Sequence, residues 1–367
     1  MYSFGFISLN PELEDQYFTE VAKRAKPLEM TCYRFKPTNI HPITELISGE
    51  VFSPEEAIWK QAEFPLPEIL YDRCFYTDTL TAKTSMAIVK WLKTRKDIDF
   101  IGHGLPNKWN LHQTLFASKL RPYVAETIKV STAQQVLSFL DRYKKVILKP
   151  EIGSGGMGIV CLEKNEETIK VVIEKQHELV NSTYPTIQPF INWLHTLLNK
   201  KSYLAQRFLP LTDHENRPFD VRIFLQKNID GSWVERGRGI RVGQQNGILS
   251  NLTVGAKPLN YQNWIDTLSN EKARFLNAEL NEIVLQLPNV LEKHYPPLFE
   301  LGVDIGIACD LSLWILDINS KPGRKVIVET TPLIEESLYT APLKYGKQLA
   351  NNRRKVRENH REKTLSD

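Results

Sequence analysis

Residues 146–158 read Val-Ile-Leu-Lys-Pro-Glu-Ile-Gly-Ser-Gly-Gly-Met-Gly, so an apolar run leads through one lysine into a segment with four glycines. The apolar run predicts a strand, and the glycines predict a turn whose backbone N–H groups can close over phosphate oxygens. Lys149 adds a compact positive charge at the strand's end. No Gly-Lys-Ser/Thr follows, and residues 159–163 predict a strand, which excludes a Walker loop and a dinucleotide fingerprint. Taken alone, the segment also fits a plain glycine-rich hairpin.

The composition is that of a folded intracellular protein. The chain has 367 residues, of which 42% are hydrophobic and 25% charged, so we expect two or three globular domains. The four cysteines are scattered and form no C-x-x-C pair, which argues against a disulfide framework or a zinc knuckle. No signal peptide and no apolar run of membrane-spanning length is visible. A cytoplasmic location is therefore expected.

Hydrophobic periodicity predicts helices and strands in an order typical of α/β and α+β proteins. Residues 1–100 alternate short apolar runs with proline-bearing turns, as in a small α/β domain. Helical spacing predicts helices at residues 81–96, 108–120 and 271–294, and residues 163–201 are predicted to be polar and then helical. Strands are predicted at residues 203–209, 220–226, 233–241, 303–308 and 313–318. We divide the chain into residues 1–100, 101–205, 206–343 and a basic tail at 344–367.

A second group of chemically informative residues lies late in the chain, at Asp304, Asp317 and Asn319. Side chains 317 and 319 face the same side of a strand, because side chains alternate with period two. Their oxygen atoms suit Mg²⁺, which takes one or two protein carboxylates and completes its shell with phosphate and water. An isolated Asp-x-Asn is also a common turn cap.

A third group is rich in arginine. Asp220-Val221-Arg222, Arg238, Arg241 and Ser250-Asn251 fall on neighbouring predicted strands and the loop that follows them. The guanidinium fork suits phosphate or carboxylate, so the candidates for carboxylate recognition are Arg222, Arg238, Arg241 and Arg324. Arg222 fits equally well as an ion-pair partner of Asp220 on a solvated sheet face.

The order of these groups resembles the ATP-grasp superfamily. Between the glycine segment and the late carboxylates lie Gln206-Arg207-Phe208 and Asp220-x-Arg222, and the late cluster continues into Pro322-Gly323. Over residues 102–330 this layout is similar to glutathione synthetase and ribosomal-protein glutamate ligase. Phe100-Ile101-Gly102, Asn107-Lys108-Trp109 and the segment 319–323 extend the resemblance, over nearly the whole chain, to the YheC/YheD-type, spore-coat-associated ATP-grasp proteins.

The resemblance implies an ATP-grasp fold with an N-terminal pre-ATP-grasp α/β domain, and ATP held between two subdomains beneath a glycine lid. The nucleotide would be bound by Lys108, Lys149, Gly153, Ser154, Gly155, Gly156, Met157, Gly158, Gln206, Arg207, Phe208, Asp220 and Ser250. Catalytic roles would fall to Lys149, Arg222, Arg241 and Asn251. One or two Mg²⁺ ions would be held by Asp304, Asp317 and Asn319.

Two positions depart from the family's pattern. Asp317 stands where the superfamily usually has Glu, so its carboxylate is one methylene shorter and bridging two ions is less secure. Arg207 stands where ligases often have an acidic hinge residue, which leaves the ribose contact to Asp220. One metal ion is therefore a firmer expectation than two.

The resemblance implies an ADP-forming carboxylate–amine ligase that acts through an acyl phosphate, joining an amino acid to a peptide, protein or small amine in spore coat formation. The alternative is a structural or binding protein of an assembly such as the spore coat, with the same fold and little or no catalysis. A nucleic-acid partner for the basic tail is not favoured, because charged terminal segments are commonly solvated. The sequence leaves the acid, the amine and the oligomeric state open.

Overall fold

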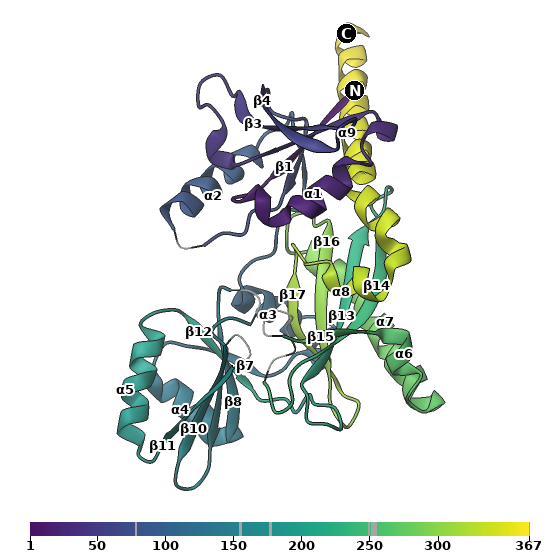
Figure 1. The fold of residues 1–367 in the computed structure, drawn as a ribbon. Helices are drawn as coiled ribbons and strands as arrows, with labels where there is room; N and C mark the ends of the chain where they lie inside the picture. The colour runs from purple at the N-terminus through teal and green to yellow at the C-terminus, as the bar shows by residue number, and fades with distance from the viewer. Residues whose placement is uncertain (78, 154–155, 176–177, 249, 251–254, 367) are drawn as a thin grey trace.

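The structure is a computed structural model that describes residues 1–77, 79–153, 156–175, 178–248, 250 and 255–366. Its described strands form three sheets, which lie in the N-terminal, central and C-terminal parts of the chain (Figure 1). The predicted mixed α/β architecture is confirmed. None of the helices in the described ranges is both long enough and apolar enough to cross a bilayer.

The N-terminal sheet is mixed, with parallel strands at its centre and an antiparallel hairpin at one edge. Its order is β4 (Ile58–Phe64), β3 (Ile47–Ser53), β2 (Met30–Phe35), β1 (Tyr2–Ile7), β5 (Ile69–Asp72) and β6 (Asp99–Ile101). Helices α1 (Asp15–Ala22) and α2 (Leu80–Leu92) and the 3₁₀ helix η1 (Pro11–Glu14) belong to this region. Because β1, β5 and β6 are parallel, the segments that follow them lie at the same end of the sheet, where the strands have their carboxyl ends. This end of the sheet contacts the C-terminal sheet.

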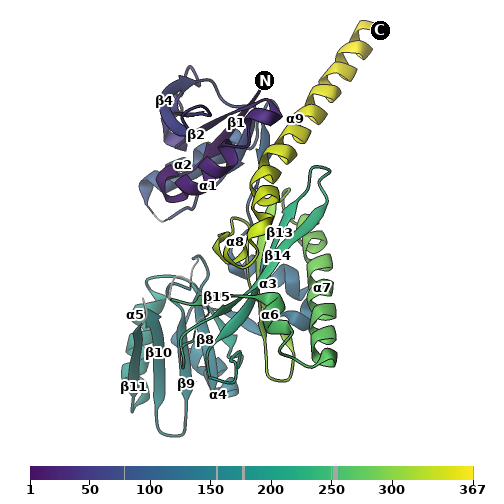
Figure 2. The same cartoon turned by 45° about the vertical axis from the view of Figure 1, so that its right-hand side comes forward.

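The C-terminal helix α9 (Glu335–Ser366) packs against the N-terminal sheet, although the two are far apart in the sequence (Figures 1 and 2). Gly346 allows the close approach, since a Cβ there would lie 2.8 Å from Ile69 Cγ2. Farther along the helix, Arg353 Nε donates to Asp99 Oδ2 at 2.7 Å. The predicted basic tail thus continues a helix whose first part is buried against the N-terminal region.

The central sheet is antiparallel throughout its described strands. Its order is β11 (Glu178–Tyr184), β10 (Ile169–Lys175), β9 (Val160–Lys164), β8 (Lys145–Pro150), β12 (Tyr203–Arg207) and β7 (Thr127–Val130). Helices α4 (Ala133–Tyr143) and α5 (Ile187–Leu198) share its hydrophobic core. The helix predicted near residue 190 is confirmed, but β10 and β11 were missed. As an edge strand, β11 exposes most of its side chains, so it carries little of the apolar signal on which such predictions depend.

The C-terminal sheet is also antiparallel, and it carries both late groups of predicted site residues. Its order is β15 (Lys257–Asn260), β14 (Trp233–Val242), β13 (Phe219–Lys227), β16 (Glu300–Ile307) and β17 (Leu313–Asn319). A core on one face is shared with α3 (Lys108–Phe116), α6 (Tyr261–Ile265) and α7 (Asn270–Glu292). Helix α8 (Lys325–Thr330) packs on β14, where a Cβ at Gly239 would lie 2.5 Å from Val326 Cγ1. The predicted strands of this region and the helix at residues 271–294 are confirmed.

Candidate active site

A cleft between the central and C-terminal sheets brings together most of the residues predicted for the nucleotide. It encloses about 1070 Å³ of space, including the part open to solvent. The predicted residues that line it are Lys108, Lys149, Gly153, Gly156, Met157, Gln206, Arg207, Phe208, Asp220, Arg241, Ser250, Asp304 and Asp317. These residues are far apart in the sequence, but in the structure they line the same cleft.

The described lining of the cleft does not include every predicted residue. Gly158, Arg222 and Asn319 are outside the lining of the cleft, and Ser154, Gly155 and Asn251 lie outside the described residues. Two of the arginines considered for carboxylate recognition are also placed away from the cleft. Arg238 Nε donates to Glu235 Oε1 at 2.6 Å, and Arg324 Nη2 donates to Glu300 Oε1 at 2.7 Å. Their guanidinium groups therefore have carboxylate partners within the protein.

Two lysines supply positive charge to one side of the cleft. Lys108 opens helix α3, whose N-cap residue Asn107 accepts a hydrogen bond from the backbone N–H of Asn110 at 2.9 Å. Its ammonium group contacts Asp317 Oδ1 at 2.6 Å. Lys149 lies nearby on β8, where burial and the charge of Lys108 lower its pKa to about 8. Two neighbouring cations and a helix N-terminus make this side suitable for phosphate.

A row of charged residues crosses the C-terminal sheet from β14 to β17. Arg241 lies opposite Asp220, and Asp304 lies opposite Asp317. Arg241 donates to both carboxylate oxygens of Asp220, at 2.7 and 2.6 Å, and contacts Asp304 Oδ2 at 2.9 Å. Ser250 Oγ also donates to Asp220. The register of the sheet therefore holds the charged groups at one end of the cleft.

The two candidate metal-ligating carboxylates have different electrostatic environments. Burial raises the pKa of Asp304 above its usual value, although Arg222 and Arg241 oppose this. Burial would also raise the pKa of Asp317, but the ammonium of Lys108 holds it below its usual value. Asp317 is thus the more firmly ionised of the two.

Asp304 also has an oxygen without a hydrogen bond. Arg222 Nε is 2.9 Å from Asp304 Oδ1, but the geometry is not that of a hydrogen bond, and both atoms lack such a partner among the described residues. A buried oxygen of this kind fits a hard cation. In the described ranges no three His, Cys, Asp or Glu side chains gather closely enough to hold a metal ion alone. An ion at Asp304 and Asp317 would therefore need further ligands, such as an amide, phosphate or water.

The end of β12 and apolar residues from several segments form another wall of the cleft. Gln206 Nε2 donates to Thr127 Oγ1 at 3.0 Å, and the guanidinium carbon of Arg207 lies 4.5 Å from the centre of the Trp314 ring. The apolar lining residues that were not among the predicted site residues are Ile147, Pro150, Ile159, Leu209, Leu211, Pro218, Phe219, Ile248 and Leu316. Ile147 could have been found, because it shares a strand face with Lys149. This wall suits the flat apolar faces of a nucleobase.

A further residue missed from the sequence is Glu174 on β10. Its Oε2 accepts a hydrogen bond from the backbone N–H of Ile248 at 2.8 Å, which joins the central sheet to the segment before β15. Ile248 and Gly247 both line the cleft. The alternating Ile169, Val171 and Ile173 could have indicated β10, but nothing in the sequence shows that Glu174 contacts Ile248.

Comparison with known proteins identifies the family. Residues 97–349 match the family model described as YheC/D like ATP-grasp. The chain belongs to the YheC/D-like ATP-grasp family. It is 38% identical over 345 residues to the endospore coat-associated protein YheC of Bacillus subtilis strain 168, covering 94% of this chain and 95% of the relative. Its identity to YheD of the same strain is 24% over 332 residues, covering 89% and 72%.

The fold of this YheC/D-like protein is also found in solved structures. The D-alanine-D-alanine ligase from Coxiella burnetii matches 100% of this chain and 98% of its own, with a TM-score of 0.57 at 9% sequence identity. At this identity the likeness concerns the fold alone. The predicted ATP-grasp fold of mixed α/β type is confirmed, as is the predicted family.

One glycine of the YheC/D-like protein is expected to be essential for the position of Arg222. A Cβ at Gly302 would lie 2.3 Å from Arg222 Nη1 and 2.6 Å from Pro322 Cβ. Gly302→Ala is therefore expected to lower the free energy of unfolding by about 1–3 kcal/mol, the usual cost of overpacking. Urea denaturation measures this difference.

Gly323→Ala is the matched control, since a Cβ there would meet nothing within 4 Å. This variant should change the free energy of unfolding by less than about 0.5 kcal/mol. Equal stability of the two alanine variants would show that Arg222 moves without cost, contrary to the prediction.

Proposed function

We propose that this protein is an ATP-dependent carboxylate–amine ligase. The supporting observation is the convergence of Lys108, Lys149 and Arg241 with Asp304 and Asp317 in one cleft that also has an apolar wall. In the proposed reaction an oxygen of the substrate carboxylate attacks the γ-phosphorus of ATP, and ADP leaves. The nitrogen of an amine then attacks the acyl carbon, phosphate leaves, and an amide forms. Such chemistry depends on positioning and charge neutralisation.

The charged residues have distinct proposed roles. Lys108 and Lys149 bind phosphate oxygens, whereas Arg241, with Arg222 and Asn251, steadies the transferred phosphoryl group. Asp304, Asp317 and Asn319 hold one or two Mg²⁺ ions, which supply further neutralisation of phosphate charge. Because Lys108 is 2.6 Å from Asp317, its ammonium must turn from the carboxylate toward the phosphates when the metal site fills.

The remaining cleft residues are proposed to bind the nucleoside. The backbone of residues 206–208 meets adenine, Asp220 and Ser250 lie at the ribose, and the glycine segment 153–158 covers the phosphates. The apolar wall supports this proposal, since bases stack on apolar and aromatic surfaces.

The proposed substrates are an amino acid and an amine on a peptide, a protein or a small molecule. The Bacillus subtilis relative YheC is named as endospore coat-associated. We propose that this chain acts in the cytoplasm in spore coat formation.

The test is mass spectrometry of the products formed from Mg-ATP with pools of amino acids and peptides. A ligase gives ADP, phosphate and a product lighter than the sum of its two substrates by one water. All three should depend on the simultaneous presence of the acid and the amine. AMP and pyrophosphate as products would contradict the acyl phosphate route, and a lack of any turnover across the pools would contradict ligation.

A second candidate function is that of a structural or binding protein of the spore coat, with little or no catalysis. It is favoured by the pairing of both candidate metal-ligating carboxylates with cations of the protein, Asp317 with Lys108 and Asp304 with Arg222 and Arg241. Each of these carboxylates therefore has a positively charged partner without a metal ion. Calorimetry with Mg-ATP separates the two functions, because an absence of binding heat at several temperatures favours the scaffold.

A further inference from the structure

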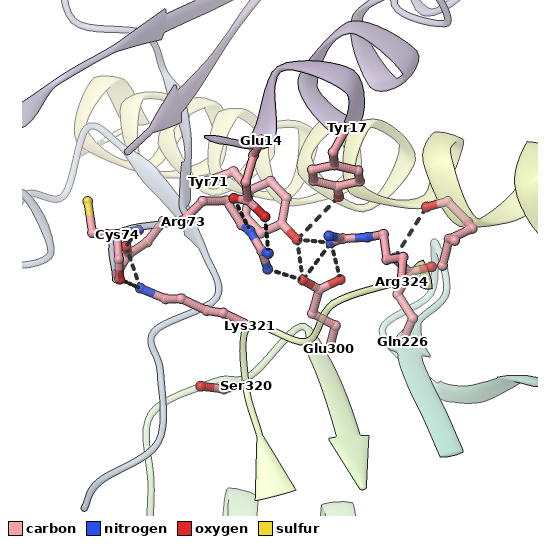
Figure 3. Close-up of polar contacts among 12 residues, drawn as sticks. Glu14, Tyr17, Tyr71, Arg73, Cys74, Gln226, Glu300, Ser320, Lys321 and Arg324 are labelled. Carbon is pink, nitrogen blue, oxygen red and sulfur yellow. Dashed lines mark hydrogen bonds and ion pairs between the residues drawn. The ribbon is translucent and has the colours of Figure 1, made fainter. Parts of the chain in front are cut away.

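Each of the two strands that carry the proposed metal ligands has one of its ends at the N-terminal region. Strand β16 begins at Glu300, before Asp304, and β17 ends at Asn319, directly before Ser320 and Lys321. Glu300 accepts from the side chain of Arg73, and Lys321 donates to the backbone carbonyl oxygen of Cys74, both in the N-terminal region, as Figure 3 shows. The start of β16 and the end of β17 thus lie next to the carboxyl end of β5.

Two consecutive residues at the end of β5 contact these two strand ends. Asp72 Oδ1 accepts from Lys321 Nζ at 2.7 Å, and the same ammonium donates to the carbonyl oxygen of Cys74 at 2.8 Å. Arg73 Nη1 donates to Glu300 Oε1 at 2.7 Å. The carboxylate of Asp72 therefore binds the segment after β17, and the guanidinium group of Arg73 binds the start of β16.

Further contacts complete this arrangement, and we call Asp72, Arg73, Glu300, Lys321 and Arg324 the interdomain cluster. Arg324 Nη2 donates to both carboxylate oxygens of Glu300, at 2.7 and 2.8 Å, and so ties the segment after β17 to the start of β16 (Figure 3). Tyr71 OH donates to Glu300 Oε1 at 2.6 Å. Outside the cluster, Leu105 N donates to Ser320 Oγ at 3.0 Å.

Asp72, Arg73, Glu300 and Arg324 are buried and Lys321 is partly buried, and burial makes the geometry of the cluster specific. Glu300 is 0% exposed and Arg73 and Asp72 are each 1% exposed. Burying ion pairs costs desolvation energy, so such a network contributes less to stability than its number of contacts suggests. It does penalise misplacement, because Lys321 would lose its carboxylate partner, whereas Asp72 would keep Lys93, whose Nζ donates to Asp72 Oδ2 at 2.7 Å. A sliding of β17 against the N-terminal region would separate Lys321 from Asp72.

We infer that Asp72 and Arg73 are positioning residues, which fix the ends of β17 and β16 and thereby the spacing of Asp304, Asp317 and Asn319. The inference rests on the proposed function, since it assigns these ends to a magnesium site. The N-terminal region then contributes to metal binding without providing a ligand. It does so through Lys321, two residues after Asn319, and Glu300, four residues before Asp304.

The decisive variant is Lys321→Met, which keeps the length of the side chain and removes its charge. Removing a positive charge near a cation site strengthens cation binding by Coulomb's law. Loss of positioning does the opposite, and we expect Mg²⁺ to bind about tenfold more weakly to the ADP-bound protein, as is usual for outer-shell changes. Isothermal calorimetry measures this affinity. ADP binding without Mg²⁺ should be unchanged, and Lys321→Arg should bind Mg²⁺ as the wild type does.

Arg73→Lys tests the other half of the cluster. The lysine keeps the charge but loses the fork that reaches Glu14 and Glu300, so Mg²⁺ affinity should again fall about tenfold. The matched control is Arg34→Lys, because Arg34 is a buried arginine that bonds Asp15 and Glu50 within the N-terminal region. The control should lose stability without losing Mg²⁺ affinity.

A second measurement follows the strand ends in the absence of metal. Hydrogen exchange of the amides at residues 315–321 should be about tenfold faster in Lys321→Met than in the wild type, because local opening becomes easier. Folded Lys321→Met and Arg73→Lys proteins with wild-type Mg²⁺ affinity and wild-type exchange would overturn the inference. If instead the wild type binds no Mg²⁺ with nucleotide, the proposed function fails, and the positioning of a metal site fails with it.

Discussion

Lys149→Met is expected to lower the rate of ATP-dependent ligation by about 10²–10³-fold, the usual effect of removing one group that stabilises developing charge. The methionine keeps most of the volume of the side chain, so β8 and the wall of the cleft should remain in place. The measurement is the rate of ADP release at saturating substrates. Lys170→Met, on the exposed side of β10 in the same sheet, is the matched control and should retain wild-type activity.

The pH dependence of nucleotide binding provides a second measurement on Lys149. Burial and Lys108 lower its pKa to about 8, so the ligand-free protein carries this charge below that pH and loses it above. Phosphate favours the protonated amine, and binding must therefore take up a proton above pH ~8. ADP affinity should fall as the pH rises through this value in the wild type and much less in Lys149→Met. A wild-type affinity that is constant across this range would contradict the assigned contact.

Asp317→Asn is expected to reduce ligation by about 10²-fold or more at physiological Mg²⁺ concentrations, because the amide keeps the shape of the side chain but not its charge. Stability should change little. Lys108 and Asp317 are each about a quarter exposed, at 26% and 25%, so solvent screening limits their ion pair to about 1 kcal/mol or less. Titration of activity with MgCl₂ measures the effect, and higher Mg²⁺ should restore part of the lost rate.

Asp310→Asn is the matched control for Asp317→Asn. Asp310 lies in the turn between β16 and β17, where it is exposed and accepts from Ser312 Oγ at 2.6 Å. Its replacement should leave the Mg²⁺ dependence unchanged. If Asp317→Asn showed the same Mg²⁺ dependence as this control, Asp317 would not be a metal ligand.

Much of the C-terminal sheet could be predicted from the sequence because its signals are local. Val221, Ile223 and Leu225 alternate with Asp220 and Arg222 along β13, and this alternation both marks a strand and puts the two charged residues on one face. The order of the lysine, glycine and carboxylate segments was equally visible, and it led to the family that the comparisons confirm.

The contacts between distant segments could not be predicted. Arg73 and Glu300 are 227 positions apart, and single charged residues with ordinary spacing give no sign that they will be buried. Arg324 was considered for substrate carboxylate, whereas its neighbour in the structure is Glu300. Only the pairing of β16 with β17 and the parallel order of the N-terminal sheet bring these groups together.

The packing of α9 has a consequence for the order in which the protein can fold during synthesis. The N-terminal region leaves the ribosome first, but its core includes Leu338 and Leu343 of α9 beside Phe4 and Ile69. At 5–20 residues per second, roughly 10 to 50 seconds of translation separate the end of the N-terminal sheet from this helix. During that interval the apolar face that α9 covers in the folded protein is exposed on the emerging sheet.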